Sequence, residues 1–377
     1  MQSHEHGPKL RVAMVVPGGV DRSGEYRVIP ALLALIERLA RRHEVQVFAL
    51  HQEPTPASWH LLGARIHNIG HGWVRARAIQ TICNAYRGAP PDVVHAIFSG
   101  SSGLVAVTAA AILRAPSLVH VAGGELAAIP AVGFGDALRW RARLREALVL
   151  RAASSITAAS QATIDTLARR RIRARRVPLG VDLRAWPRRA PHRRAEGEPA
   201  RLIHVGSLNP VKDHATLLAG LSLLAQRGVR FEMDLVGEDA LNGEIQRLAR
   251  TLGLLDHVRF RGFLPQPQLR PLVEAAHLLI VSSRHETGPL AMLEAAAVGV
   301  PTVGTAVGHV AEWSPRAALA VPVADPGALA RAIEALLVDE DRRLSLARNA
   351  QAMAALEDAE RTAASFEEIY RSLTRGR

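Results

Sequence analysis

The sequence predicts an α/β protein made of two doubly wound, parallel-sheet domains that face a cleft. Three observations support this prediction. The chain has 377 residues, which is enough for about two domains. Short apolar runs alternate with helical patterns in both halves, which is typical of parallel sheets covered by helices. Between the halves, residues 184–200 are rich in Pro and Arg and poor in large apolar side chains, so a linker is expected there.

The first half starts with an apolar strand at 10–16, which runs into the glycine pair Gly18 and Gly19. A helical pattern follows at 26–42. Further strands are expected at 45–50, 66–69, 93–97 and 118–121, and further helices at 73–87, 103–114 and 138–150. We expect this N-terminal domain to span residues 1–183.

The second half repeats the alternation from residue 201 to residue 360. Strands are expected at 202–205, 233–236, 258–260, 278–281 and 302–305, and helices at 215–227, 244–252, 268–276 and 289–298. A final helix at 361–377 is expected to pack back on the N-terminal domain. In open sheets of this kind, ligands bind outside the carboxyl ends of the strands, so the cleft between the halves is the expected site.

Composition excludes several classes of protein. Cys83 is the only cysteine, which argues against a disulfide framework and fits a reducing compartment. No signal peptide or apolar run of transmembrane length is found, so a cytoplasmic location is expected. The net charge of +12 permits an anionic partner, but with 4% aromatic residues a nucleic-acid partner is not expected.

Other patterns argue against particular sites. No Cys or His cluster has the spacing of metal ligands, so no metal is expected, and Asp339 and Asp341 are interpreted as a solvated face between helices. The SGSSG run at 99–103 lacks the order of a nucleophile elbow, and its serines are expected to cap the next helix. The helix at 138–150 is basic, but its arginines at 139, 141, 143 and 145 fall on two faces, which argues against a membrane-surface helix.

The stretch 278–304 holds the clearest candidate site. An apolar strand leads into a polar loop and then into a helix whose first-turn N–H groups are free to bind an anion, which suits a phosphate. Glu286 lies in the loop and Glu294 on the helix, eight positions apart. Glu360 and Glu368 repeat that interval in an ordinary helical pattern, so the spacing alone assigns no role.

Two other loops follow predicted strands of the second half. The first, 206–212, opens with Gly206 and ends with Lys212, one of only two lysines among 47 basic residues. A compact ammonium at this position suits a phosphate, although chance is the alternative. Gly237 follows the next strand, where a simple turn is an equal alternative. His95 and His120 lie in apolar strands and are interpreted as hydrogen-bonded core histidines, and His285 is expected to orient the loop beside Glu286.

With these residues assembled, the second half resembles the retaining glycosyltransferases of the GT-B fold, family four (glycosyl transferases group 1). Glu286 and Glu294 match that family's pair of glutamates separated by seven residues. Agreement in the first half is weaker and rests on 92–95 and on VPLGVD from Val177. The motifs that carry the resemblance are VGSLNPVKD from Val205, LVGE from Leu235, VRFRGFL from Val258 and HETGPLAMLEAAAVGVPTV from His285.

The resemblance implies a retaining hexosyltransferase that uses a nucleotide-sugar co-substrate, with UDP or GDP expected, and neither a metal nor another cofactor. Lys212 would neutralise the donor diphosphate, Glu294 would bind the ribose hydroxyls, and Glu286 would face the transferred sugar. The implied catalytic residues are thus Glu286 and Lys212. The implied donor-binding residues are Gly206, Ser207, Lys212, Gly237, Gly288, Pro289, Leu290 and Glu294.

The chain departs from the family pattern in three places. Ser207 stands where an arginine is common, and Thr287-Gly288-Pro289 replaces Gly-Phe-Gly. The histidine often seen on the acceptor side is missing, so the residues expected there are Gly18, Gly19, Gly123 and Glu125. The acceptor, whether a glycan, a lipid-linked molecule or a small molecule, stays open, as does peripheral contact with the inner face of a membrane.

Two alternatives remain at this point. One is an isomerase on the same two-domain frame, such as a sugar-nucleotide 2-epimerase. The other is a basic protein that binds nucleic acid or a membrane without chemistry.

Overall fold

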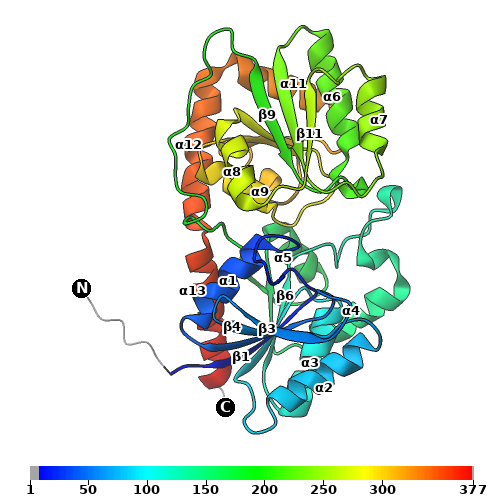
Figure 1. Cartoon of the computed structure of the whole chain (residues 1–377), viewed down its shortest axis with the longest axis vertical. Coiled ribbons are helices and arrows are strands. Elements are labelled where there is room, and N and C mark those ends of the chain that lie inside the picture. Colours follow the sequence, from blue (N-terminus) through cyan, green and yellow to red (C-terminus); the bar gives the residue numbers. More distant parts are fainter. Residues whose placement is uncertain (1–7, 376–377) are drawn as a thin grey trace, which may run out of the picture. The chain divides into compact units, whose positions relative to one another are not determined.

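The computed structural model describes residues 8–375. The start of the predicted N-terminal domain, residue 1, and the end of the predicted last helix, residue 377, lie outside the described residues. The prediction of an α/β protein with two parallel-sheet halves is confirmed (Figure 1). One compact unit contains the described residues up to Ile129, Gly135–Leu179 and the chain from Ala359 onward. The other contains Pro130–Phe134 and Gly180–Asp358.

The first unit is built on an eight-stranded sheet in the order β3-β4-β2-β1-β5-β6-β7-β8. All neighbouring pairs are parallel except β3 and β4, which are antiparallel. The central strands are buried on both faces, which explains why they read as continuous apolar runs. The strands are β1 (Arg11–Val16), β2 (Glu44–Ala49), β3 (Ala57–Leu61), β4 (Ala64–Asn68), β5 (Val93–Ile97), β6 (Ser117–Val121), β7 (Ser155–Ala158) and β8 (Arg175–Arg176).

Helices of the first unit begin later, or with other caps, than the sequence predicts. The pattern at 26–42 forms a helix only from Pro30, because the residue before a proline avoids helical geometry and Ile29 is extended. The predicted serine caps at 99–103 are wrong, since the cap position falls on Gly100 and no side chain bonds there. The helices are α1 (Pro30–Ala40), α2 (Val74–Ala85), α3 (Ser101–Leu113), α4 (Trp140–Ala152), α5 (Gln161–Arg169) and α13 (Ala359–Arg375).

The second unit has a six-stranded sheet, all parallel, in the order β11-β10-β9-β12-β13-β14. Its strands are β9 (Ala200–Val205), β10 (Phe231–Val236), β11 (Val258–Gly262), β12 (Leu278–Val281), β13 (Thr302–Thr305) and β14 (Ala318–Val321). Its helices are α6 (His214–Gln226), α7 (Glu244–Thr251), α8 (Gln266–Ala275), α9 (Leu290–Ala297), α10 (Gly308–Trp313), α11 (Pro326–Val338) and α12 (Glu340–Leu356).

Each face of this second sheet has its own hydrophobic core. Leu278 and Ile280 of β12 pack with the cluster that includes α6 and α11, while Leu279 and Val281 pack with the cluster that includes α9 and α12. The alternation follows from the two-residue period of a strand, and burial on both faces is typical of a parallel sheet. Asp339, part of the predicted solvated pair, accepts a hydrogen bond from the Arg342 N–H and caps α12.

Helix α13 completes the core of the first unit. Phe366 and Tyr370 are fully buried there, and the Tyr370 hydroxyl lies 2.6 Å from His95 Nδ1. His120 Nδ1 bonds Thr157 Oγ1 at 2.9 Å, and burial lowers the pKa of His120 to about 3. The interpretation of both residues as hydrogen-bonded core histidines is confirmed.

The segment at 184–199 contains neither helix nor strand, yet it is attached to the second unit. Trp186 is buried in that unit's core. Arg343 of α12, also buried, donates to the carbonyl oxygen of His192 at 2.6 Å. Arg193 pairs with Asp341 at the surface. The segment therefore contacts the second unit at several points as well as connecting two sheets.

Candidate active site

The candidate site of the second unit lies where β9 and β12 end. These strands are neighbours in the sheet, so the loops that follow them, 206–212 and 282–289, run side by side. The Ser282 hydroxyl donates to the Lys212 carbonyl oxygen at 2.7 Å, and the Arg284 N–H donates to the Val211 carbonyl oxygen at 2.8 Å. Two segments far apart in the sequence are thereby fixed against each other.

Lys212 and Glu286 meet across these two loops. Lys212 Nζ lies 2.5 Å from Glu286 Oε1, and the Ser283 hydroxyl donates to the same oxygen at 2.6 Å. Lys212 ends a short 3-10 turn capped by Asn209, whose side chain accepts from the Lys212 N–H. The two predicted catalytic residues therefore form one ion pair, and a hydroxyl holds the carboxylate in place.

Glycines allow the loops of this corner to approach so closely. The Gly206 N–H donates to Val236 O at 2.8 Å, and the Gly237 N–H donates to Gly262 O at 2.9 Å. A Cβ on Gly206 would lie 3.0 Å from Lys212 Cε, and a Cβ on Gly237 would lie 2.0 Å from the Gly206 carbonyl oxygen. Gly237 thus belongs to the same corner, and any side chain there would push the two loops apart.

The N-terminus of α9 also opens at this corner. Pro289 is the cap residue and not the first helical residue, so the helix predicted from residue 289 begins at Leu290. No side chain bonds the backbone at this cap. Gly288 lies against His309, because a Cβ there would be 2.8 Å from His309 Cε1. The first N–H groups of α9 thus follow directly on the loop that holds Glu286, and they carry the positive end of the helix dipole.

Glu294 lies further along α9 and is 6% exposed. Burial raises the pKa of its carboxyl group to about 7, against the opposing effects of hydrogen bonds from Gln266 and Trp186. The Gln266 Nε2 group donates to Glu294 Oε1 at 3.1 Å. A buried carboxyl group with one amide donor retains capacity to accept further hydrogen bonds, and hydroxyl groups are suitable donors.

Several residues of this corner were not predicted as site residues. Ser283 holds Glu286, Gln266 holds Glu294, and Arg284 Nε lies 2.9 Å from Asp213 Oδ2, where Asp213 caps α6. Ser283 stands only three positions before Glu286, so the sequence already suggests that these two residues lie close together. Gln266 starts α8 and has no such signal. Of the predicted donor residues, Ser207 is exposed and Leu290 is partly buried.

The residues predicted for the acceptor side belong to the first unit. Gly18 and Gly19 follow β1, and the Gly19 N–H donates to Gln52 Oε1 at 2.7 Å. Gly123 and Glu125 follow β6, where Glu125 Oε2 accepts from the Gly123 N–H at 2.7 Å. The other oxygen, Oε1, accepts from the Ser99 N–H at 3.1 Å. The loop after β1 is therefore held by the Gln52 side chain, and the Glu125 carboxylate is held by two backbone N–H groups.

A second glutamate lies beside Glu125. Burial raises the pKa of Glu146, on α4, to about 7, and the nearby charge of Glu125 adds to this effect. Burial also raises the pKa of Glu125, although backbone N–H groups oppose it. Arg145 is turned towards Asp136, with 2.9 Å between Nη2 and Oδ2. The loop after β6 is thus backed by a buried acidic pair.

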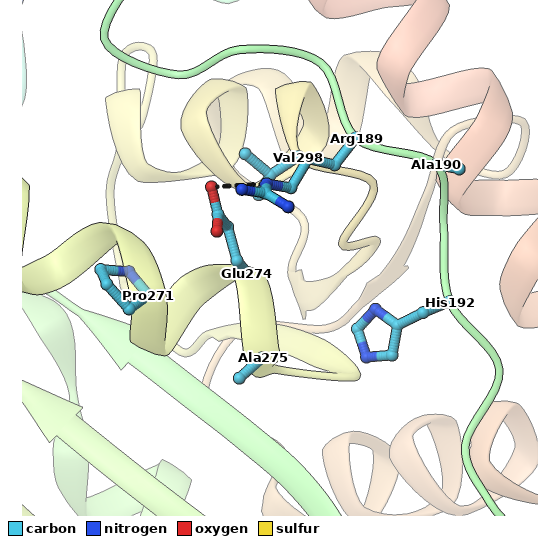
Figure 2. A pocket seen from close by; sticks show the side chains of 7 residues that line it. All are labelled: Arg189, Ala190, His192, Pro271, Glu274, Ala275 and Val298. Carbon is cyan, nitrogen blue, oxygen red and sulfur yellow. Dashed lines mark ion pairs between the residues drawn. The ribbon is translucent and has the colours of Figure 1, made fainter.

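The second unit also has a pocket of about 500 Å³ that none of the predicted site residues lines (Figure 2). It lies between the segment Arg189–His192 and α8, with Val298 at the C-terminal end of α9. Arg189 Nε pairs with Glu274 Oε1 at 2.9 Å across it. A helix of eight residues is about 12 Å long, so this pocket is separated from the corner at Pro289.

Two kinds of feature are absent from the part of the chain that the structure describes. Within residues 8–375, no three or more His, Cys, Asp or Glu side chains are grouped as a metal ion would need. None of the helices in that range combines the length and the apolar character needed to cross a membrane.

Comparison with curated proteins gives partial matches. The chain is 34% identical over 193 residues to a D-inositol 3-phosphate glycosyltransferase of Corynebacterium urealyticum, which is 48% of this chain and 46% of that protein. It is 30% identical over 202 residues to a glycogen synthase of Mycobacterium tuberculosis, with 52% and 48% covered. The chain therefore matches about half the length of these relatives.

Comparison with solved structures covers nearly the whole chain. Sucrose-phosphate synthase from Thermosynechococcus elongatus aligns with a TM-score of 0.82 at 21% identity, covering 97% of this chain and 100% of that one. Anabaena Alr3699/HepE aligns with a TM-score of 0.74 at 19% identity, covering 96% and 100%. At these identities the likeness concerns the fold, which is GT-B.

Family models match both halves. Residues 28–180 match the glycosyl transferase 4-like domain, and residues 188–353 match the glycosyl transferases group 1 model. Together the two matches cover well over half of the chain. The chain therefore combines a glycosyl transferase 4-like domain with a glycosyl transferases group 1 domain, in the GT-B fold that its sequence motifs predict.

Proposed function

We propose that this protein is a retaining glycosyltransferase that moves a sugar from a UDP- or GDP-linked donor to a glycan, lipid-linked or small-molecule acceptor. The single observation that carries the proposal is the Lys212–Glu286 ion pair at the strand ends of the second unit. It joins a cation suited to a diphosphate with a carboxylate suited to sugar hydroxyl groups.

The pair suggests how a donor would enter. Diphosphate oxygens would replace Glu286 as the partner of the Lys212 ammonium, and Glu286 would be released towards the sugar. Ser283 would keep the carboxylate in position during this exchange, because its hydroxyl already bonds Oε1. The N–H groups at the start of α9 would share the negative charge that grows on the departing nucleotide. No covalent group of the protein is needed for this stabilisation.

Glu294 would bind the two ribose hydroxyl groups. Its carboxyl group is buried and has one amide partner, Gln266, so a vicinal diol would supply two further donors. Fold likeness adds support for the donor class, since Anabaena Alr3699/HepE is described in complex with UDP-glucose. A nucleotide-sugar co-substrate needs no further cofactor in this scheme.

The donor is tested by thermal unfolding with UDP, GDP and ADP, because a ligand that binds only the folded protein raises its melting temperature. We expect a shift with UDP or GDP for the wild type and for Lys9→Ala, and none for Lys212→Ala. Lys9, the only other lysine, is exposed and serves as the matched control. Equal shifts for Lys212→Ala and the wild type would contradict the proposal.

Transfer itself is measured as nucleotide release from the donor that gives the shift, with a panel of acceptors. Removing an electrostatic contact to the leaving group costs about a hundredfold to a thousandfold in rate, so Lys212→Ala should lose that much. A sample without acceptor separates the isomerase alternative. Formation of a C2 epimer of the donor in that sample would establish an epimerase and overturn the transferase proposal.

A further inference from the structure

Helix α4 presents an apolar stripe to solvent. Trp140, Leu144 and Leu148 are 62%, 55% and 55% exposed, and they stand four residues apart. At 3.6 residues per turn this spacing places them on one side of the helix, over about 12 Å. The inward side is formed by Ala142, Glu146, Val149 and Leu150, which are buried. The stripe is therefore the outer face of a helix whose opposite face is already packed; Figure 1 labels this helix as α4.

Arginines surround this stripe. Arg139, Arg141, Arg143 and Arg151 are exposed, and within residues 8–375 none of them lies at ion-pair distance from a carboxylate. The Arg141 guanidinium lies 5.3 Å from the centre of the Trp140 ring. Arg145 differs, because it turns inward to Asp136. The outer face of α4 thus combines three large apolar side chains with unpaired positive charge.

The sequence led to the opposite expectation, that α4 is not a membrane-surface helix, because its arginines at 139, 141, 143 and 145 fall on two faces. In the folded chain Arg145 is withdrawn into an ion pair, and the apolar residues decide the character of the outer face.

We propose that the outer face of α4, made of Trp140, Leu144 and Leu148 with Arg141 and Arg151 and flanked by Arg143, docks on an anionic lipid surface. A helix that lies in the membrane interface inserts apolar side chains to the level of the acyl chains and keeps basic groups at the headgroups. Tryptophan prefers this boundary, and arginines add attraction to anionic lipid. A nucleic acid would use the charges but would gain little from Leu144 and Leu148.

The test uses the full-length protein and vesicle flotation, without donor or acceptor, so its outcome is independent of the sugar-transfer proposal. Vesicles of phosphatidylcholine alone are compared with vesicles that also contain phosphatidylglycerol. We expect the wild type to float with the anionic vesicles. The double variant Leu144→Ser/Leu148→Ser should bind these anionic vesicles with an affinity lower by about tenfold or more, since apolar burial is a main source of interfacial affinity.

The matched control is Leu255→Ser/Leu356→Ser, which replaces two leucines of the second unit that are 50% and 54% exposed. This control should bind like the wild type. Circular dichroism melting of both double variants checks that they are folded, and Arg141→Gln/Arg151→Gln supplies a second test that leaves the apolar stripe intact. It should weaken binding to anionic vesicles and reduce its sensitivity to salt.

Three results would overturn the inference. The first is absence of wild-type binding to anionic vesicles. The second is equal binding by the α4 leucine variant and its control. The third is salt-sensitive binding of single-stranded RNA or duplex DNA that exceeds vesicle binding and does not change in the leucine variant, which would identify a nucleic-acid surface.

Discussion

The strand-end corners of the two sheets hold their glutamates by different means. In the second unit, Glu286 receives its hydrogen bonds from side chains, Lys212 and Ser283. In the first unit, Glu125 receives them from backbone N–H groups of Ser99 and Gly123. A lysine side chain can turn to another anion at little cost, whereas a backbone group moves only with its loop. The first arrangement suits exchange with a ligand, and the second suits a fixed wall.

A second pair of glutamates makes the same contrast. Burial raises the pKa of Glu294 and of Glu146 to about 7. Glu294 has the amide donor Gln266 beside it, whereas Glu146, although bonded by Ser99, also has the carboxylate of Glu125 beside it. Ribose hydroxyl groups of a bound nucleotide would lower the free-energy cost of a negative charge on Glu294. At Glu146 the neighbouring negative charge raises that cost further.

The largest effect is expected from a glycine of the donor corner. A Cβ at residue 237 would lie 2.0 Å from a backbone oxygen, whereas one at residue 123 would lie 3.0 Å from Glu125 Oε2 and 3.1 Å from Phe98 Cε1, both side-chain atoms. Gly237→Ala should therefore lower the free energy of unfolding by about 3–4 kcal/mol, and Gly123→Ala by about 1 kcal/mol. Urea unfolding measures both. Gly88→Ala, with no atom within 4 Å, is the control. Similar losses of unfolding free energy in Gly237→Ala and Gly123→Ala would contradict this difference between the two corners.

Glu294→Gln should have opposite effects on stability and on donor binding. The folded pKa is about 7 and the ordinary value is 4.5, so the folded state binds more protons between these values and wild-type stability falls as pH rises through them. At pH 8 the variant should be more stable than the wild type by about 2–3 kcal/mol, and at pH 4 equally stable. Its affinity for the nucleotide should fall.

Urea unfolding at pH 4 and pH 8, with nucleotide titration at pH 8, checks both parts. Glu196→Gln, at an exposed glutamate of the same unit, is the control and should change neither quantity. A variant less stable than the wild type at pH 8 would show that the carboxylate is compensated in the free protein.

The smallest effect is expected in the first unit, where two adjacent glutamates should respond with opposite signs. Glu125→Gln replaces one accepting oxygen by an amide that cannot accept from the Ser99 or Gly123 N–H, so it should cost about 1–2 kcal/mol. Glu146→Gln should raise stability at pH 8, because the pKa of Glu146 is raised by burial in the folded state. Unfolding curves at pH 8 check both signs, and destabilisation by both substitutions would contradict this assignment.

Much of the fold could be predicted because each central strand is an apolar run followed by a glycine or a polar loop. Strands β3, β7, β8 and β14 were not predicted, and for β3 and β8 the reason is physical. Strand β3 is half exposed along its length and pairs with one neighbour, and β8 is only Arg175 and Arg176. Neither has the apolar run by which a central strand is recognised.

The candidate site was predictable to a different degree. Lys212, Glu286 and Glu294 stand on loops and a helix that the strand pattern locates, so they could be named from the sequence. Their partners could not. The contact of Gln266 with Glu294 and of His309 with Gly288 depends on how α8 and α10 pack, and residue order contains no signal for either.

The return of α13 to the first unit affects the order in which the protein can fold during synthesis. Phe366, Ile369 and Tyr370 fill the core against β1 and β5, although they are made after the entire second unit. The first sheet therefore leaves the ribosome with part of its apolar surface uncovered, and it stays so until the second unit has been translated. A fragment that stops at Leu179 would keep that surface exposed and would be prone to aggregation.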